Sequence, residues 1–244
     1  MIKKFLLCIA AVGMLAGCST VVNYSNLPNE SLFTSGYEFM DKGNYTNAVQ
    51  MFRNIILNAD NPSNAQIAQK LMADAYFLNG DYADAIAAYE VYYELYRRSN
   101  DLAYVIYMLG VSYSNISLSG GRDTAYAQKA LEYFEELEIR FPEAYTRFSA
   151  ASHKTLMLKK LSDYEYRVAR YYYRVNAYEP AMTRLVYLVN IYPGAPVEEE
   201  AYVLLVKTAL KDDALKAYAP IYLDELRKHY PNNKKIASFE KKLK

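Results

Sequence analysis

Small residues recur at fixed spacings between residue 31 and about residue 230, within stretches whose apolar positions have helical spacing. Twelve positions separate the two small residues in Gly36 and Ala48, in Ala73 and Ala85, and in Ala169 and Ala181. An aromatic residue follows the first small residue by three positions, and a bulky residue follows the second by four. Helices that bury one face cross closely where both facing side chains are small, so this spacing predicts antiparallel helix pairs.

The polar breaks between these stretches carry helix-end signals. Gly43-Asn44 and Gly80-Asp81 place a glycine just past one helix and a polar cap before the next. Glycine and proline are otherwise scarce, at 9 and 8 residues, which disfavours a strand-rich fold. The pattern resembles the tetratricopeptide repeat and predicts an all-α superhelix of about five helix-turn-helix repeats.

Two copies depart from the regular spacing. In the third copy, twenty positions separate Gly110 from Ala130, so eight residues are inserted around residues 117–123. In the fifth copy, Lys207 stands where a small residue is expected, which leaves the register of its first helix open. The stretch 145–164 is expected to be helical and continuous with, or kinked into, the next helix. The Lys-rich residues 232–244 are expected to form a frayed basic tail.

The first residues read as an export signal. Lys3 and Lys4 precede an apolar run too short to span a bilayer, and the run ends in Leu15-Ala16-Gly17-Cys18. This tetrapeptide resembles the bacterial lipobox, which implies a lipoprotein signal peptide at 1–17 and acylation of Cys18. Ser19 favours the outer membrane, and residues 18–30 read as the lipidated cysteine and a flexible tether. The alternative is an ordinary secretory signal with a chance cysteine.

Charge and composition exclude several functions. The chain has 28 basic and 27 acidic residues, so no basic field exists to hold nucleic acid. Its two cysteines both lie in the first eighteen residues, and its two histidines, His153 and His229, are far apart. A disulfide framework and a metal site are therefore not expected. No phosphate-binding loop or catalytic constellation appears, so we expect no cofactor and no enzymatic activity.

Tyrosine is unusually abundant, at 27 residues, and there is no tryptophan. Many tyrosines fall at core positions of the repeats, and a dense aromatic stretch surrounds the junction of the second and third copies: Tyr92, Tyr93, Tyr96, Tyr104 and Tyr107. Others are expected on the inner wall, where tyrosine tolerates varied peptide sequences. The candidate peptide groove consists of Phe33, Tyr37, Met40 and Phe77.

Residues 122–193 carry a more specific resemblance. They include Arg122-Asp123, the run from Ala127 to Phe141-Pro142, and Tyr192-Pro193. This stretch closely resembles the BamD family, the tetratricopeptide lipoproteins of the outer-membrane β-barrel assembly (BAM) machinery. The resemblance implies a lipid-anchored protein on the periplasmic face of the outer membrane. Its partners would be the barrel subunit BamA, other BAM subunits and unfolded outer-membrane β-barrel proteins.

The resemblance also implies a division of labour. The C-terminal repeats, 145–231, would dock on the periplasmic POTRA domains of BamA. The N-terminal repeats, 31–144, would offer a groove to barrel precursors or to the tail of an accessory subunit. The family pairs an arginine of the fourth repeat with an acid of BamA, and Arg184 occupies that position; the alternative is a solvated helix arginine. Reversing its charge is expected to weaken docking without unfolding the repeat.

Two positions depart from the family pattern. Arg97-Arg98-Ser99 replaces a Tyr-Pro at the end of the second repeat, and Thr124 replaces a proline after Arg122-Asp123. These departures concern the detailed shape of the N-terminal groove and not the architecture. A different periplasmic tetratricopeptide scaffold, for envelope or peptidoglycan machinery, is the alternative function. A lipoprotein that captures glycans or hides a hydrolase is a third possibility, but it would favour an added domain or a tryptophan-rich pocket.

Overall fold

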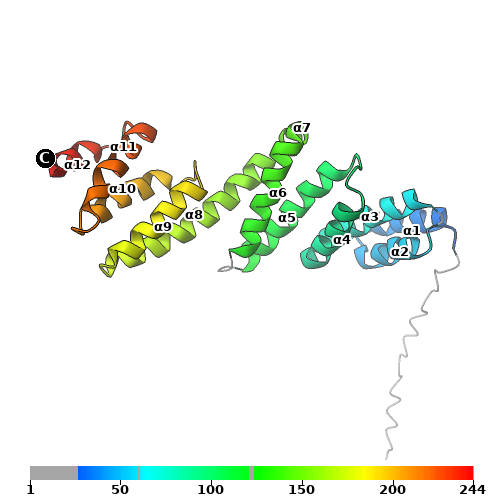
Figure 1. The fold of residues 1–244 in the computed structure, drawn as a ribbon. Helices are drawn as coiled ribbons and strands as arrows, with labels where there is room; N and C mark the ends of the chain where they lie inside the picture. Colours follow the sequence, from blue (N-terminus) through cyan, green and yellow to red (C-terminus); the bar gives the residue numbers. More distant parts are fainter. Residues whose placement is uncertain (1–26, 60, 121–123, 244) are drawn as a thin grey trace, which may run out of the picture.

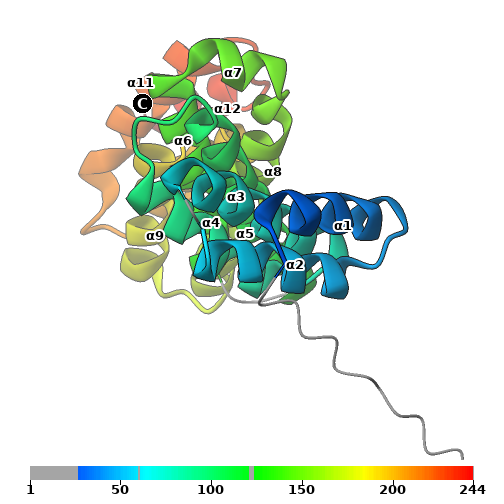
Figure 2. The ribbon, with the colours of Figure 1, turned by 90° about the vertical axis from the view of Figure 1, so that its right-hand side faces the viewer.

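The computed structural model describes residues 27–59, 61–120 and 124–243, and within these ranges every regular element is a helix. Five antiparallel hairpins follow one another along an elongated molecule, and successive hairpins are rotated about its long axis (Figures 1 and 2). The predicted all-α tetratricopeptide superhelix of five repeats is confirmed for these residues. The hairpins are α1 (Asn29–Asp41) with α2 (Tyr45–Leu57), α3 (Pro62–Asn79) with α4 (Tyr82–Leu95), α5 (Leu102–Gly120) with α6 (Ala125–Arg140), α8 (Ala150–Arg174) with α9 (Tyr178–Ile191), and α10 (Glu198–Ala209) with α11 (Ala219–His229).

The small residues mark the points where the two helices of a hairpin meet. A methyl group on Gly36 would lie 2.6 Å from Cε1 of Phe52, and one on Gly110 would lie 2.6 Å from Cε1 of Phe134. Both phenylalanines are fully buried, as is Ala130. The bulky residue four positions after the second small residue therefore lies directly against the glycine of the first helix. This packing explains the spacing in the sequence.

The turns follow the predicted chemistry only in part. Gly43 and Gly80 both adopt the left-handed conformation, with φ of 70° and 83°, where a residue with a Cβ is strained. The Asn44 side chain caps α2 by accepting a hydrogen bond from the backbone N–H of Asn47 at 3.4 Å. The side chain of Asp81 does not cap α4, and it accepts a hydrogen bond from the Asn79 amide at 2.6 Å instead.

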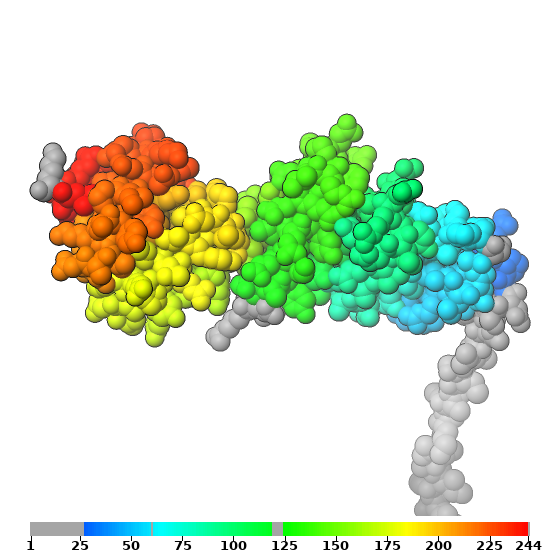
Figure 3. All heavy atoms as spheres, in the orientation of Figure 1, coloured from blue at the N-terminus to red at the C-terminus, as the bar shows by residue number. Residues whose placement is uncertain are grey.

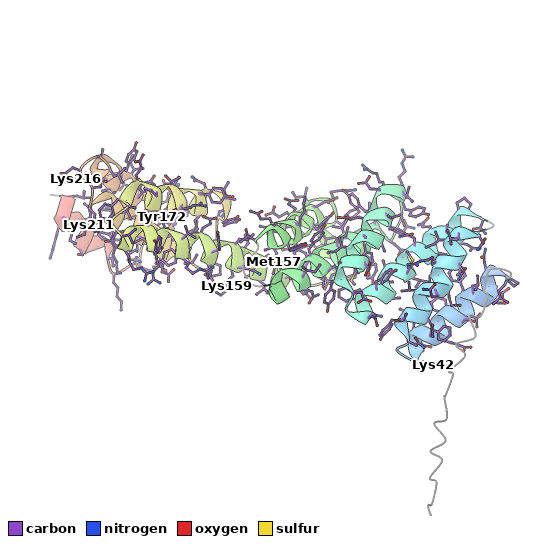
Figure 4. The ribbon with its side chains drawn as sticks, turned by 90° about the horizontal axis from the view of Figure 1, so that it is seen from below. Lys42, Met157, Lys159, Tyr172, Lys211 and Lys216 are labelled. Atoms are coloured by element: carbon purple, nitrogen blue, oxygen red, sulfur yellow. The ribbon has the colours of Figure 1, made fainter. Side chains whose placement is uncertain are left out.

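Helix α8 connects the first three hairpins, which form one half of the molecule, with the last two, which form the other. It runs for 25 residues, and its N-terminal part buries Met157 in the cluster formed with α5 and α6. Its C-terminal part buries Ala169 in the next cluster, against α9 and α10. The outline of the molecule narrows where the two halves meet, and Met157 lies near this junction (Figures 3 and 4). The expected helix over 145–164 is present as the short α7 (Pro142–Arg147) and the start of α8, with a break at Ser149, whose φ is 54°.

Polar contacts replace the missing Tyr-Pro at the end of the second repeat. The Ser99 hydroxyl lies 2.7 Å from the Tyr92 hydroxyl and accepts a hydrogen bond from Nε2 of Gln66 at 2.8 Å. The Arg97 guanidinium pairs with Glu94 on the preceding turn of helix. This departure from the family pattern therefore has a defined structural role.

The C-terminal end corrects one expectation. Most of the Lys-rich stretch 232–244 forms a helix, α12 (Ile236–Leu243), which follows the short 3-10 turn η1 (Lys216–Tyr218) and α11. Phe239 is only 3% exposed and packs into the last core cluster, with Ile236 and Leu243 beside it. The prediction of a frayed tail is wrong for residues 236–243, because these apolar side chains share one face of the helix and cap the open end of the superhelix.

Candidate partner-binding surfaces

The candidate lipid anchor lies outside the described residues. The structure does not describe Cys18, the signal-like segment 1–17 or most residues of the expected tether. The acylation of Cys18 therefore stays a prediction. Among the helices of residues 27–243 that the structure describes, none combines the length and apolarity needed to cross a bilayer. Residues 121–123 of the insertion are also outside the described ranges, while the residues before them lengthen α5 to 19 residues.

Three of the four candidate groove residues gather on the first hairpin. Tyr37 is 47% exposed, and its ring stacks beside that of Phe33 at 6.4 Å and meets the edge of Phe52 at 6.2 Å. Phe33 and Met40 are half-buried against the first core cluster. The buried phenylalanine that packs on Gly36 therefore also supports an exposed aromatic surface on α1.

Phe77 lies elsewhere. It is half-buried between the second and third hairpins, and its ring meets Tyr82 at 5.4 Å. Among the described residues it makes no ring contact with Phe33 or Tyr37. A partner that contacts both Tyr37 and Phe77 would therefore have to extend from the first hairpin to the second.

The aromatic stretch at the second and third repeats is mainly structural. Tyr92 is fully buried, and Tyr107 stacks on Phe148 at 4.9 Å. The hydroxyls of Tyr89 and Tyr104 both donate to Oδ1 of Asp74, at 2.5 and 2.9 Å. Burial raises the pKa of the Asp74 carboxyl, although both tyrosine hydroxyls and Lys70 oppose this effect.

Tyrosine–carboxylate hydrogen bonds recur through the superhelix, usually between neighbouring helices. The donor and acceptor pairs are Tyr113 with Glu90 at 2.7 Å, Tyr93 with Glu136 at 2.9 Å, and Tyr230 with Glu198 at 2.6 Å. Each ring is half-buried, and its hydroxyl reaches a carboxylate of another helix, which in the case of Glu198 is itself buried. Together with the two bonds to Asp74, they give five of the 27 tyrosines a structural role that the sequence does not predict.

Arg184 is placed on α9 and forms an ion pair within the chain. Its Nη1 lies 3.1 Å from Oε2 of Glu165 on α8, and the two side chains are 45% and 10% exposed. The guanidinium is therefore accessible to a partner on one side and held in place on the other. An arginine fixed in this way loses less conformational freedom on binding than a mobile one.

Reversing the charge of Arg184 is expected to weaken docking without unfolding the repeat, and this geometry adds a cost in stability to that expectation. Glutamate at this position would put a second carboxylate beside Glu165, which is nearly buried and would lose its counter-charge. Breaking a buried pair costs about 3–5 kcal/mol, and the half-exposed arginine reduces this to about 1–3 kcal/mol. The charge reversal is therefore not a clean test of docking.

The two histidines have structural surroundings. His153 stacks on the Phe134 ring at 5.7 Å, and Nε2 of His229 lies 3.2 Å from Glu225 one turn away on α11. In the part of the chain that the structure describes, no three histidine, cysteine or acidic side chains gather closely enough to hold a metal ion.

Comparisons with known proteins identify the family of this chain. The model of the YfiO family, described as an outer membrane lipoprotein, matches residues 25–219. "Outer membrane protein assembly factor BamD" of Xylella fastidiosa (strain Temecula1 / ATCC 700964) is 27% identical, covering 77% of this chain and 70% of that protein. The protein of the same name from Rickettsia prowazekii (strain Madrid E) is 24% identical, covering 96% and 94%.

Solved structures give more distant likenesses. A crystal structure of MamA protein covers 87% of this chain and 95% of its own, at 17% identity and a TM-score of 0.37. The TPR2AB domain of yeast Sti1, in a complex titled with pHSP90, covers 88% and 96%, at 12% identity and a TM-score of 0.36. The family match extends from just before α1 to the start of α11 and so covers almost the whole superhelix. This chain belongs to the YfiO family of outer membrane lipoproteins, which includes the BamD proteins.

Proposed function

We propose that this protein is an outer membrane protein assembly factor: a non-catalytic scaffold held at the periplasmic face of the outer membrane by acyl chains on Cys18. The family match over residues 25–219 carries this proposal, because the matching relatives are named as assembly factors. The continuous stack of hairpins supports it, since such stacks present long surfaces to protein partners. Isolation of the native protein from solubilised membranes tests it. A β-barrel protein with POTRA domains should co-purify, whereas retention of peptidoglycan factors alone would favour the alternative scaffold function.

Within this function, the C-terminal repeats, 145–231, dock on the POTRA domains of BamA through Arg184. The N-terminal repeats, 31–144, receive segments of unfolded barrel proteins on the surface that contains Phe33, Tyr37 and Met40. Two observations support this division: Arg184 is half-exposed and oriented by Glu165, and the most exposed ring of the first hairpin, Tyr37, lies beside Phe33.

Arg184 and Glu165 give a test of docking that does not depend on stability. We expect the double variant Arg184→Gln/Glu165→Gln to fold and to bind the purified POTRA domains of BamA about tenfold more weakly, because one charge-assisted contact is lost. Affinity is measured by calorimetry, and folding is checked by circular dichroism. The double variant leaves no unpaired carboxylate between α8 and α9.

The single variant Glu165→Gln is the matched control. It keeps the guanidinium, and the glutamine oxygen can still accept from Nη1 and orient it, so binding should equal that of the wild type. Wild-type affinity in the double variant would remove Arg184 from the interface. An equal loss in both variants would assign the effect to the α8–α9 contact and not to the arginine.

Tyr37 gives a test of the N-terminal groove. Tyr37→Ala is expected to weaken binding of an aromatic-rich peptide from the C-terminal strand of a barrel protein about fivefold, because an exposed ring supplies contact area at low entropy cost. Tyr37→Phe keeps the ring and its stacking on Phe33, so it should bind as the wild type does. Fluorescence anisotropy of the labelled peptide reports both. Equal affinities for the alanine variant and the wild type would contradict the groove assignment.

A further inference from the structure

A groove with mixed apolar and cationic walls lies where the third and fourth hairpins meet. It has a volume of about 320 Å³ and is formed by the end of α5, the residue before α6 and one face of α8. Leu118 of α5 and Leu156 of α8 line it and are 50% and 39% exposed. Lys159, another lining residue, lies at the narrow junction of the two halves in Figure 4. We call the set Leu118, Leu156, Lys160, Tyr164 and Arg167 the α8 groove.

Positive charge dominates the walls of this groove. Three cations, Lys159, Lys160 and Arg167, line it together with a single carboxylate, Asp163. That carboxylate is already paired with Lys159 one turn away on α8. Within the described ranges, neither Lys160 nor Arg167 forms an ion pair with a carboxylate. The groove therefore holds two cations that no carboxylate of the described residues neutralises.

Both of these cations are held in position. The Lys160 ammonium donates to the backbone carbonyl of Ser117, near the C-terminal end of α5, where helix carbonyls are partly negative. The Arg167 guanidinium lies over the Tyr164 ring, 5.7 Å from its centroid. Such stacking leaves the guanidinium N–H groups free at its edge for a ligand oxygen. The two groups are therefore preorganised to receive a carboxylate.

The apolar walls distinguish between possible anions. A phosphate or a lipid headgroup would satisfy Lys160 and Arg167 but would leave Leu118 and Leu156 in water. A protein segment with a large apolar side chain beside an acidic one would cover both, and 320 Å³ is enough for such a side chain. The same face of α8 continues past the groove to Tyr171 and Arg174, which are both exposed. This continuation favours an extended ligand over a compact one.

We propose that the α8 groove binds an extended segment of a partner protein in which acidic and large apolar residues alternate. A carboxylate of the segment is held between Arg167 and Lys160, and an apolar side chain enters between Leu118 and Leu156. Arg184, whose partner Glu165 is also on α8, does not line this groove, and neither does any residue of the aromatic surface of α1. The site therefore goes beyond the proposed function and remains testable if either of those surfaces is wrongly assigned.

The experiment uses the full chain in detergent and three fluorescein-labelled dodecapeptides. One alternates glutamate and leucine, one replaces each glutamate with glutamine, and one replaces each leucine with serine. We expect saturable binding of the first peptide and at least about tenfold weaker binding of the other two, which each lose one class of contact. Binding of the first peptide should also weaken with added salt, because its carboxylates meet exposed cations.

Variants then locate the site. Arg167→Gln and Leu156→Ser should each weaken binding of the glutamate–leucine peptide about five- to tenfold. Arg147→Gln is the matched control, because Arg147 is an exposed cation that stacks on Phe148, lies on α7 and does not line the groove. It should bind as the wild type does. Thermal unfolding confirms that all three variants are folded.

Three results would overturn the proposal. Equal losses in Arg167→Gln and Arg147→Gln would indicate nonspecific attraction to exposed cations. Equal binding of the glutamate–leucine and glutamate–serine peptides would show that the leucines take no part. Displacement of the peptide by millimolar inorganic phosphate, or by phosphatidylglycerol vesicles in detergent-free solution, with the same sensitivity to Arg167→Gln, would assign the site to a phosphate or a lipid headgroup instead.

Discussion

Gly110→Ala should lower the free energy of unfolding by about 1–3 kcal/mol, although alanine is the better helix former. Alanine in place of a helical glycine normally contributes about 1 kcal/mol of stability. Here the added methyl group would lie 2.6 Å from Cε1 and 2.9 Å from Cδ1 of Phe134. Phe134 is fully buried and packs against Tyr107 and His153, so its ring has no free space to move into. Chemical denaturation followed by circular dichroism measures the loss.

The fourth hairpin supplies the matched control. It has Ala169 and Leu185 at the positions that Gly110 and Phe134 occupy in the third hairpin. The double variant Gly110→Ala/Phe134→Leu should therefore be less destabilised than the sum of its two single variants, by about 0.5–3 kcal/mol of coupling. Strict additivity would mean that the methyl group does not meet the ring. A Gly110→Ala variant that is more stable than the wild type would show that helix propensity outweighs packing at this crossing.

This crossing also shows how much of the fold can be predicted from sequence. In the first four hairpins, each crossing has a glycine or alanine on both helices and a bulky residue four positions after the second of them. This pattern is local and repeats along the chain. The same is true of the positive-φ glycines at 43 and 80. The signal is periodic because every hairpin solves the same packing problem, so the number and order of the hairpins follow from it. The lipobox is similarly local, and its chemistry stays a prediction.

The contacts between hairpins cannot be predicted from such local signals. Tyr93 finds its acceptor 43 positions away, at Glu136, and Arg184 finds Glu165 on the preceding helix. Nothing in the local sequence distinguishes a tyrosine that donates to a buried carboxylate from one that faces a ligand. The sequence therefore predicts one groove from Phe33, Tyr37, Met40 and Phe77, whereas in the structure Phe77 lies on the second hairpin and makes no ring contact with Phe33 or Tyr37. The sequence does not predict helix α12, because the lysines of this stretch obscure the apolar face formed by Ile236, Phe239 and Leu243.

Aromatic and charged contacts of this kind also determine how the scaffold holds its shape. In a stack of hairpins, each hairpin contacts mainly its neighbours. The weakest junction therefore limits how firmly two distant binding surfaces are held in a fixed relative orientation. Asp74 connects the second and third hairpins by accepting bonds from Tyr89 of α4 and Tyr104 of α5. The surface of α1 and the α8 groove lie on opposite sides of this junction.

Asp74→Ala should lower the free energy of unfolding by about 1–3 kcal/mol near pH 4, because it leaves the hydroxyl of the buried Tyr89 without its acceptor. Asp74→Asn keeps an oxygen that accepts both hydroxyls and removes the buried charge. Burial raises the pKa of Asp74 in the folded state above 3.8. The folded protein therefore holds this proton more tightly than the unfolded chain does, and the wild type loses stability as pH rises from about 4 through the raised pKa.

The asparagine variant lacks this loss, so its stability relative to the wild type should rise from pH 4 to pH 7. Thermal unfolding of both proteins across that range gives the difference directly, and the other carboxylates cancel because the two chains share them. Lys70 retains a partner in the variant, since it pairs with Asp101 at 2.8 Å. A constant difference between wild type and Asp74→Asn would show that the carboxylate is as well solvated as in the unfolded chain. A difference that falls with pH would show that Lys70 and the two hydroxyls outweigh burial, and that the ionised form holds this junction together.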